Sequence, residues 1–312
     1  MIRITTLLAL LCVVAGCAAE PAGESHASCT MREMAVLPIQ FEHDTILVPV
    51  RINDVTTLMG VDTGASGTVL NANAARVLHL PEDTHHATTI HGVGGTFTTP
   101  NVLVRSFEFG GLTGPPRSFA TSLLSKSFSP STTVSGTLGA FDFADFDVEL
   151  DVPNQRMTLW LVNGCTGSFV KWNEPWYVVP LTRDRGGLLR TTVYVNGQPV
   201  QALIDWGARG TVITRTAAGR IGVTDAMLEH DVAGHSEGID QNQIPARRHD
   251  FDEIRIGSDK LQPPRISVAD LDWKGSDLLL GMDYAKTRHI WLSYGTHQMF
   301  VAPGGVKAAS GQ

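Results

Sequence analysis

The feature that most constrains the fold of this 312-residue chain is a short loop that occurs twice. The segment VDTGASGTVLN spans residues 61–71, and IDWGARGTVIT spans residues 204–214. Over the eight positions that start at the aspartate, the two copies agree at six. They differ at two positions, Thr63 against Trp206 and Ser66 against Arg209. A loop repeated at this distance predicts two similar structural units in one chain.

Four further landmarks follow in the same order at nearly the same offset. They are residues 50–54 with 193–197, 91–95 with 234–238, 137–143 with 279–284, and 147–160 with 288–301. Each reads as an apolar strand, a hairpin turn or a glycine-rich tip. The period is the size of a domain and too long for a solenoid. The sequence therefore predicts two similar β-rich lobes, residues 37–162 and 179–302, joined by a linker at 163–178.

Composition supports this interpretation and excludes one class of partner. Hydrophobic residues make up 43% of the chain and 31 residues are glycine, which favours an all-β protein with ample core material. The net charge is −7, without the clusters of Lys and Arg that phosphate binding requires. We expect no nucleic-acid partner.

The N-terminal residues have the pattern of an export signal. Arg3 is followed by an apolar run from Ile4 to Val14 and then by small residues, and the run is too short to remain as a membrane span. The sequence VAGC at 14–17 resembles the lipobox of bacterial lipoproteins, which implies signal cleavage after residue 16 and acylation of Cys17. The alternative is ordinary secretion with cleavage near residues 18–19. Residues 18–36 are small and polar, as expected of a tether, and residues 303–312 form a tail. By the lipobox resemblance, Ala18 after the cysteine favours the periplasmic face of the outer membrane.

Two cysteines remain once the signal is removed and Cys17 carries lipid. Cys29 and Cys165 lie far apart in sequence, with no His or Cys at the spacing of a zinc site. In an oxidising compartment such a pair predicts a disulfide.

The repeated loop places a carboxylate at the end of an apolar strand. Glycine after the aspartate lets the backbone turn and approach a ligand closely. If the two lobes meet at these loops, Asp62 and Asp205 come together and share one proton, because two adjacent carboxylates cannot both ionise cheaply. The ionised member can then activate water while the protonated member polarises a carbonyl. This chemistry indicates amide hydrolysis without metal or cofactor.

Taken together, these motifs resemble the retropepsin-like aspartic protease family. The resemblance rests on VDTGAS with its apolar lead-in, the GTVLN continuation, the glycine-rich segment 91–95 and TLGAFDF at 137–143, and it covers most of residues 37–302. It implies two closed β-barrel lobes related by a pseudo-twofold axis. Each lobe would donate an Asp loop, a glycine-tipped flap and an apolar-Gly segment that supports the loop.

The resemblance also implies roles for individual residues. Asp62 and Asp205 match the catalytic aspartates, Thr63 the residue that locks the facing loops together, and Ser66 a residue that bonds the carboxylate. The remaining active-site loop residues are Gly64, Ala65, Trp206, Gly207 and Arg209. The matches to the flap tips are His91, Gly92, Val93, Gly94 and Gly95 in lobe 1 and Gly234, His235 and Ser236, with residues up to 238, in lobe 2.

The second loop departs from the family pattern. Trp206 has no hydroxyl, so the reciprocal hydrogen bonds between facing threonines cannot form as they do in the family. Arg209 either pairs with Asp205 and favours its ionised form, or points outward and leaves it available. The leading hypothesis is an aspartic endopeptidase that binds an extended polypeptide. The alternatives are a peptide-binding pseudo-protease and a homodimer in which only lobe 1 is active.

Other candidate sites are weaker. His85, His86 and His91 lack a carboxylate or thiolate that would complete a metal site, so we expect surface histidines. The glycine-rich segment 92–97 has no helix-forming run after it, which favours a hairpin tip over a nucleotide loop.

Overall fold

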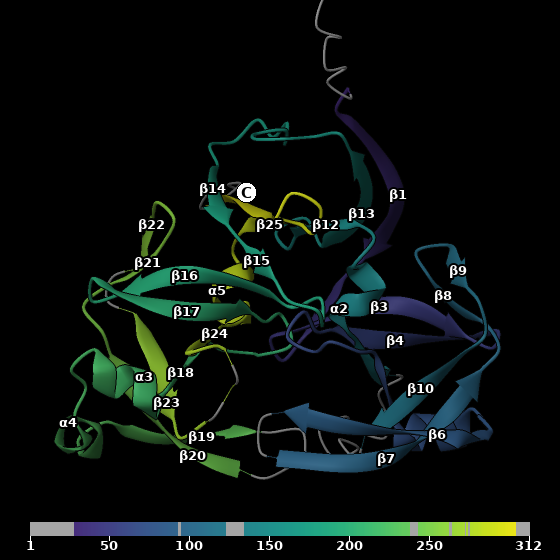
Figure 1. Cartoon of the computed structure of the whole chain (residues 1–312), viewed down its shortest axis with the longest axis horizontal. Coiled ribbons are helices and arrows are strands. Elements are labelled where there is room, and N and C mark those ends of the chain that lie inside the picture. The colour runs from purple at the N-terminus through teal and green to yellow at the C-terminus, as the bar shows by residue number, and fades with distance from the viewer. Residues whose placement is uncertain are drawn as a thin grey trace, which may run out of the picture.

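The computed structural model describes residues 28–303, except 93–94, 123–133, 238–242, 262–263, 272 and 274. Within that part of the chain most residues lie in strands, which confirms the all-β prediction. Two ten-stranded sheets form the lobes and a six-stranded sheet joins them. Figure 1 shows the lobes on either side of the molecule, with the six-stranded sheet above them.

The sheet of lobe 1 follows the order β6-β7-β10-β5-β11-β4-β3-β8-β9, and β2 pairs with β3. Its strands are β2 (Gln40–Glu42), β3 (Thr45–Ile52), β4 (Val55–Val61), β5 (Val69–Asn71), β6 (Glu82–Gly92), β7 (Gly95–Val104), β8 (Phe107–Phe109), β9 (Leu112–Gly114), β10 (Arg117–Ser122) and β11 (Val134–Leu138).

The sheet of lobe 2 repeats this path strand by strand as β19-β20-β23-β18-β24-β17-β16-β21-β22, and β15 pairs with β16. Its strands are β15 (Thr182–Arg183), β16 (Leu189–Val195), β17 (Gln198–Ile204), β18 (Val212–Thr214), β19 (Val232–Glu237), β20 (Gln243–Asp250), β21 (Ile254–Ile256), β22 (Asp259–Leu261), β23 (Arg265–Ala269) and β24 (Leu278–Leu280). The identical order confirms that the repeated sequence folds into two similar lobes.

The expectation of closed barrels is not met. In each lobe the path of paired strands has two separate ends, β6 and β9 in lobe 1 and β19 and β22 in lobe 2. A barrel closes only when its first and last strands pair. Here, in the described part of the chain, the two end strands of each lobe are not paired with one another, so each sheet is open.

Short helices follow the strands in both lobes. They are α1 (Ala72–Val77) and α2 (Ala140–Phe143) in lobe 1, and α3 (Arg215–Arg220), α4 (Asp225–Glu229) and α5 (Met282–Ala285) in lobe 2. The Asn71 side chain caps α1 by accepting from the N–H of Asn73, and the Thr214 side chain caps α3 in the same way from Ala217. A side-chain acceptor at the N-cap satisfies an otherwise unpaired N–H, so both helices begin where the sequence places a cap.

The hairpin turns also repeat. Asn53 and Asp54 have φ of 45° and 73°, and Asn196 and Gly197 have φ of 48° and 77°. Positive φ at both central residues is the type I′ turn that matches the twist of a hairpin, and Asn, Asp and Gly tolerate it best. Each turn therefore directs its lobe's first hairpin, which delivers the strand that leads into the aspartate of the repeated loop.

The six-stranded sheet contains strands from both lobes and from the N-terminal segment. Its order is β1-β13-β12-β25-β26-β14, with the strands β1 (Thr30–Pro38), β12 (Asp147–Asp151), β13 (Arg156–Asn163), β14 (Tyr177–Pro180), β25 (His289–Ser293) and β26 (Gln298–Ala302). The lobes join where β12 pairs antiparallel with β25, with Val148 opposite Leu292. One continuous sheet thus fixes the position of one lobe relative to the other.

The N-terminal segment is more ordered than the sequence predicts. Residues 30–36, which belong to the predicted tether, form most of β1 and pair with β13. Cys29 and Cys165 form the predicted disulfide, which ties the start of β1 to the segment after β13. Cys17 and the rest of the predicted signal lie outside the described residues.

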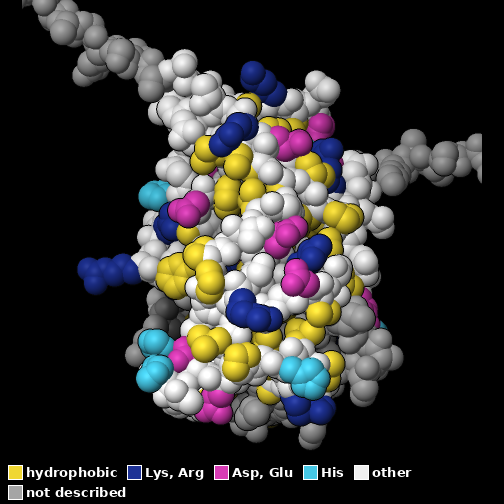
Figure 2. All heavy atoms as spheres, turned by 90° about the vertical axis from the view of Figure 1, so that its right-hand side faces the viewer, with side chains coloured by type: hydrophobic (Ala, Val, Ile, Leu, Met, Phe, Trp, Pro, Cys, Tyr) yellow, Lys and Arg dark blue, Asp and Glu magenta, His cyan; other side chains and the backbone are white. Residues whose placement is uncertain are grey.

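The outer face of lobe 1 is a mixed surface. Figure 2 shows apolar, basic and acidic side chains interspersed over it without a large field of one charge. Among the described residues, no helix has the length and hydropathy needed to cross a lipid bilayer.

Candidate active site

The two aspartates stand at the ends of equivalent strands. β4 leads into Asp62 and β17 leads into Asp205, and both residues are largely withdrawn from solvent. The N–H of Asp62 donates to the carbonyl of Leu138 at 2.9 Å, and the N–H of Asp205 donates to that of Leu280 at 3.0 Å. Each aspartate is therefore anchored by the strand next to its own in the same lobe.

Each carboxylate is held by its own loop. Oδ1 of Asp62 accepts from the N–H groups of Gly64 at 3.1 Å and Ala65 at 2.9 Å. Oδ1 of Asp205 accepts from Gly207 at 2.9 Å and Ala208 at 3.0 Å. The two loops have the same geometry, although the second carries Trp206 and Arg209.

The structure brings the two carboxyl groups into direct contact. Each carboxyl group packs against the glycine of the opposite loop, and the two groups are close enough to affect each other's pKa. A Cβ added to Gly64 would lie 2.4 Å from the Asp205 carboxyl carbon, and one added to Gly207 would lie 2.4 Å from that of Asp62. Since no Cβ tolerates such a contact, glycine at both positions is required for the approach.

Burial and mutual repulsion perturb both carboxyls. Desolvation raises the pKa of Asp62 to about 6, against the lowering effect of the hydrogen bonds from Ala65 and Gly64. Desolvation and then the negative charge of Asp62 raise the pKa of Asp205 to about 7. The pair titrates as one unit and holds one proton across the mildly acidic range.

Thr63 locks the two loops together. Its hydroxyl donates to the carbonyl of Ile204 at 2.9 Å and accepts from the N–H of Trp206 at 3.0 Å. Half of the reciprocal arrangement expected for facing threonines is thus present. The other half needs a hydroxyl that Trp206 lacks, and the Trp206 side chain is instead buried in the main hydrophobic core at 1% exposure. Core packing replaces the missing hydrogen bonds in lobe 2.

Arg209 and Ser66 occupy equivalent positions in the two aspartate loops, and the contacts of Ser66 differ from what the resemblance implies. Arg209 is exposed, and within the described part of the chain it has no ion pair with Asp205 or any other carboxylate. Asp205 therefore remains available to Asp62. Ser66 makes no hydrogen bond to Asp62 among the described residues; its hydroxyl lies against Gly186 of lobe 2, where an added Cβ would be 2.5 Å away.

The apolar-Gly segments support both loops from behind. Ala140 donates to the carbonyl of Ala65 at 2.8 Å, and Met282 donates to that of Ala208 at 2.8 Å. An added Cβ would lie 2.4 Å from the Gly67 backbone at Gly139 and 2.6 Å from the Gly210 backbone at Gly281. The backbones therefore meet directly, and the aspartate loops have little room to move.

Two hairpins extend from the lobes on the side opposite the six-stranded sheet. They are β6–β7 and β19–β20, and Figure 1 shows them below the aspartate loops. His91, Gly92 and Gly95 lie at the end of the first hairpin, and His91 bonds Thr96 at 2.9 Å; Val93 and Gly94 lie outside the described residues.

The predicted tip of the second hairpin is displaced in sequence. Gly234, His235 and Ser236 belong to strand β19, because the pairing with β20 continues to Glu237 opposite Gln243. Lobe 2 carries helix α4 before this hairpin, where the described residues of lobe 1 form no helix, so a match by offset alone placed the tip too early. Gly238 lies outside the described residues.

A loop of lobe 2 that the sequence did not single out contacts the lobe 1 site. Asp184 accepts from the N–H groups of Gly186 at 2.8 Å and Leu188 at 3.0 Å, which folds the loop before β16. This loop carries Gly186 to Ser66 and Gly187 to Ala140. The sequence of residues 184–187 is DRGG, which is typical of a turn. This pattern is the sequence feature that could have identified the loop.

Across the described ranges no group of three or more His, Cys, Asp or Glu side chains is placed to hold a metal ion. His86, one of the histidines considered from sequence, bonds Asp83 at 2.7 Å.

Comparisons with known proteins agree with this geometry. The family model described as aspartyl protease matches the chain twice, at residues 48–139 and 191–284, and so covers more than half of it. The two matches coincide with the two lobes and contain both aspartates.

Curated relatives match this chain over a limited length. DNA damage-inducible protein 1 of Cryptococcus neoformans is 34% identical over 112 residues, which are 36% of this chain and 25% of the relative. Protein DNA-DAMAGE INDUCIBLE 1 of Arabidopsis thaliana is 29% identical over 119 residues, 38% of this chain and 28% of the relative. Protein DDI1 homolog 2 of Homo sapiens is 34% identical over 95 residues, 30% of this chain and 22% of the relative. The chain spans about a quarter of the length of these relatives.

Proposed function

The chain belongs to the aspartyl protease family, and from that premise we propose that it is an endopeptidase in which Asp62 and Asp205 act as one catalytic pair. The observation that carries this proposal is the direct approach of the two carboxyl groups, each packed against the glycine of the opposite loop, within loops of matching geometry. Trp206 does not disturb the second loop, because its backbone N–H donates to Thr63 and its side chain enters the core.

The proposed reaction is hydrolysis of a peptide bond by water. The ionised carboxyl removes a proton from the attacking water while the protonated carboxyl donates its proton to the carbonyl oxygen of the substrate. Collapse of the tetrahedral intermediate breaks the C–N bond. The carboxyl that took the water proton gives it to the leaving nitrogen, and a hydroxyl of the intermediate returns its proton to the other carboxylate. In the resting state the shared proton lies mainly on Asp205, because the charge of Asp62 raises the pKa of Asp205.

The proposed substrate is an extended polypeptide held between the aspartate pair and the hairpins β6–β7 and β19–β20. An extended chain presents unpaired N–H and C=O groups, and strand edges bind such groups by sheet-like hydrogen bonds. Both hairpins lie on the side of the aspartates that faces away from the six-stranded sheet (Figure 1).

Cleavage of a mixed peptide library tests the activity. The purified protein is incubated with the library from acid to neutral pH, and products are identified by mass spectrometry. Because the working pair holds one proton, activity should peak between the pKa values of about 6 and about 7. Asp62→Asn, checked for folding by its thermal transition, should give no products. Absence of cleavage at every pH, with peptide binding retained, would favour a peptide-binding pseudo-protease instead.

We also propose that Cys17 carries a lipid that anchors the protein to the bacterial cell envelope. Support comes from the sequence VAGC after an apolar run. Fractionation of cells expressing the full chain should place it with membranes, and Cys17→Ser should release it. If Cys17→Ser remains with the membranes, the anchor lies elsewhere.

A further inference from the structure

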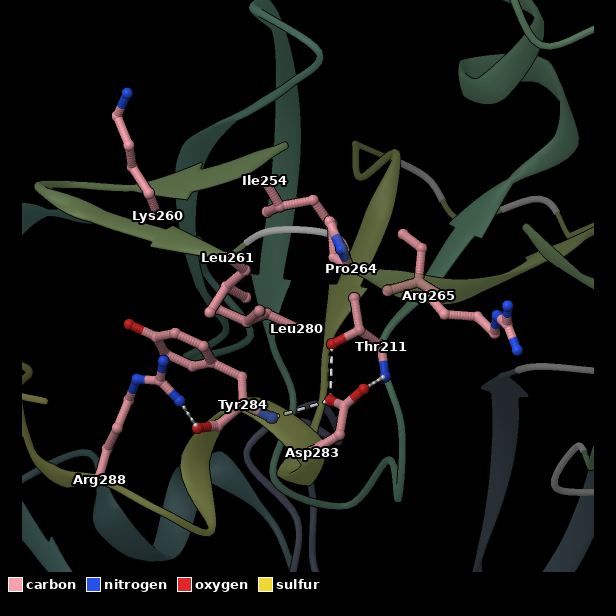
Figure 3. A pocket seen from close by; sticks show the side chains of 11 residues that line it. Thr211, Ile254, Lys260, Leu261, Pro264, Arg265, Leu280, Asp283, Tyr284 and Arg288 are labelled. Atoms are coloured by element: carbon pink, nitrogen blue, oxygen red, sulfur yellow. Dashed lines mark hydrogen bonds between the residues drawn. The ribbon is translucent and has the colours of Figure 1, made fainter. Parts of the chain in front are cut away.

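Lobe 2 contains a pocket of about 470 Å³ away from the aspartate pair. Its walls include Ile254, Pro264, Ile266, Asp283 and Tyr284, and Figure 3 shows Asp283 on one side of it. Pockets that take small molecules typically have volumes of ~300–1,000 Å³, so this one has the size of a binding site.

The internal duplication identifies the same space in lobe 1. Val69 lies beside Ala120 in lobe 1, and the equivalent Val212 lies beside Ser267 in lobe 2. Counting back along β10 and β23 from these positions aligns Phe119 with Ile266 and Arg117 with Pro264.

The opposite wall aligns in the same way. Ile52 lies opposite Phe107, and the equivalent Val195 lies opposite Ile254. Asp142 and Asp283 follow the two apolar-Gly segments and accept from the hydroxyls of the equivalent residues Thr68 and Thr211.

In lobe 1 an arginine fills this space. The Arg117 guanidinium lies 4.8 Å from the ring centre of Phe107 and 4.4 Å from that of Phe119. It forms an ion pair of 2.6 Å with Asp142, whose side chain is only 5% exposed. The chain thus contains a complete guanidinium site made of two apolar walls and one carboxylate.

In lobe 2 the carboxylate and the apolar walls remain but the arginine does not. Ile254 and Ile266 are smaller than the phenylalanines, and Pro264 cannot extend to Asp283. Asp283 is exposed to the pocket, and within the described ranges it has no cationic partner.

The Asp283 carboxylate still has capacity for a ligand. It accepts from the N–H of Thr211 at 2.8 Å, the hydroxyl of Thr211 at 2.7 Å and the N–H of Tyr284 at 2.9 Å. An ionised carboxylate offers about four acceptor sites, so one is left for a donor in the pocket.

The cations around the pocket are already paired. Arg288 bonds Asp259 at 2.7 Å, Lys260 bonds Glu253 at 3.2 Å, and Arg265 bonds Asp250 at 2.6 Å. In Figure 3 the charged ends of Lys260 and Arg265 point away from the other lining side chains. Asp283 therefore supplies the charged group of the pocket lining that is available to a ligand.

We propose that this pocket binds a guanidinium group on an aliphatic stem, such as an arginine side chain, with Asp283 as its counter-ion and Ile254 and Ile266 as its walls. The ligand takes the place in lobe 2 that the Arg117 side chain takes in lobe 1. Because Asp283 also holds Thr211, six residues after Asp205, an occupied pocket stiffens the loop that carries the second aspartate.

Calorimetric titration with L-argininamide tests the proposal, with L-citrullinamide as the uncharged probe of the same shape. The wild type should bind one argininamide and bind citrullinamide at least tenfold more weakly. A second titration, with acetyl-Gly-Arg-Gly-amide, tests whether an arginine within a peptide also enters the pocket. Binding heat from argininamide alone assigns the pocket to small guanidinium compounds. Binding heat from both ligands assigns it to arginine side chains of peptides as well.

Two variants close the pocket in different ways. Pro264→Arg rebuilds the lobe 1 arrangement and should weaken argininamide binding at least tenfold. Ile266→Phe narrows the pocket without adding charge and should do the same; thermal unfolding checks that both variants fold. Equal binding by the wild type and both folded variants would overturn the proposal, and so would absence of argininamide binding to the wild type. None of these binding measurements depends on proteolytic activity, so they test the pocket independently of the proposed protease function.

Discussion

Replacing Asp205 by Asn should stabilise the fold at neutral and alkaline pH. Asn keeps an oxygen that can accept from the N–H groups of Gly207 and Ala208, and its amide can donate to Asp62, so the loop geometry is retained. What the substitution removes is a carboxyl whose ionisation is costly in the folded state, because it is buried beside a second carboxyl.

The magnitude follows from the raised pKa of Asp205, which is about 7 in the fold against 3.8 for an unperturbed aspartate. The folded state therefore binds the proton more tightly than the unfolded state, and the free energy of unfolding falls as pH rises between these two values. Each tenfold change in proton affinity is worth about 1.4 kcal/mol, so the penalty above pH 7 is on the order of 4 kcal/mol. Below pH 4 both states are protonated and the penalty disappears.

Urea unfolding of the wild type and Asp205→Asn at pH 4 and pH 8 measures this difference. The variant should be more stable than the wild type by several kcal/mol at pH 8 and by little at pH 4. Asp184→Asn is the matched control with the opposite sign, since the hydrogen bond from Arg190 lowers the pKa of Asp184 and the variant should lose stability at pH 8. If the stability gain of Asp205→Asn is the same at both pH values, the carboxyl pair does not share its proton as described.

Three further predictions concern the contacts that hold the site. Thr63→Val removes both hydrogen bonds between the loops and should lower the free energy of unfolding by about 2–4 kcal/mol in a urea titration. Gly281→Ala forces a Cβ to within 2.6 Å of the Gly210 backbone, so thermal unfolding should occur well below the wild-type temperature, whereas Gly295→Ala, with open space around it, should change little. Glu149→Gln breaks the buried pair with His289 and should cost roughly 3–5 kcal/mol near pH 6, where Glu149 with its lowered pKa and His289 with its raised pKa are both charged. That loss should shrink as pH falls through the lowered pKa of Glu149, where the carboxyl becomes protonated in the folded state as well, and a loss independent of pH would contradict the charged pair.

Much of the fold could be predicted because the same structural signals occur in both halves of the sequence. Hairpin turns such as Asn53-Asp54, apolar strands and the glycine after each aspartate are local signals, and their repetition fixes the equivalence of the lobes. The contact of Asp62 with Asp205 then followed from two lobes meeting at equivalent loops.

The features that were missed depend on distant parts of the chain. The pairing of β12 with β25 joins residues about 140 positions apart, and neither strand has a local mark of its partner. The same holds for β1, whose sequence reads as a polar connection until β13 supplies its hydrogen bonds. The tip of the β19–β20 hairpin lies later in the sequence than predicted because helix α4, which precedes the hairpin, shifts its position relative to lobe 1.

Trp206 illustrates why a sequence pattern can overstate a defect. A tryptophan in place of a threonine removes a hydroxyl, which the sequence shows, but its burial in the core appears only in the fold. The backbone N–H of residue 206 still donates to Thr63, because a backbone group does not depend on the side chain. Arg209 likewise could pair with Asp205 by sequence, and its exposed position leaves the aspartate pair intact.

The central claim is that Asp62 and Asp205 of one chain form one catalytic pair, and a mixing experiment tests it most directly. Peptide cleavage per mole of chain is measured for wild type, Asp62→Asn, Asp205→Asn and an equimolar mixture of the two variants over a hundredfold range of concentration. A pair within one chain predicts a constant wild-type specific activity, two inactive variants and an inactive mixture. Full activity of Asp205→Asn, or activity of the mixture that rises with concentration, would contradict it and assign catalysis to lobes of different molecules.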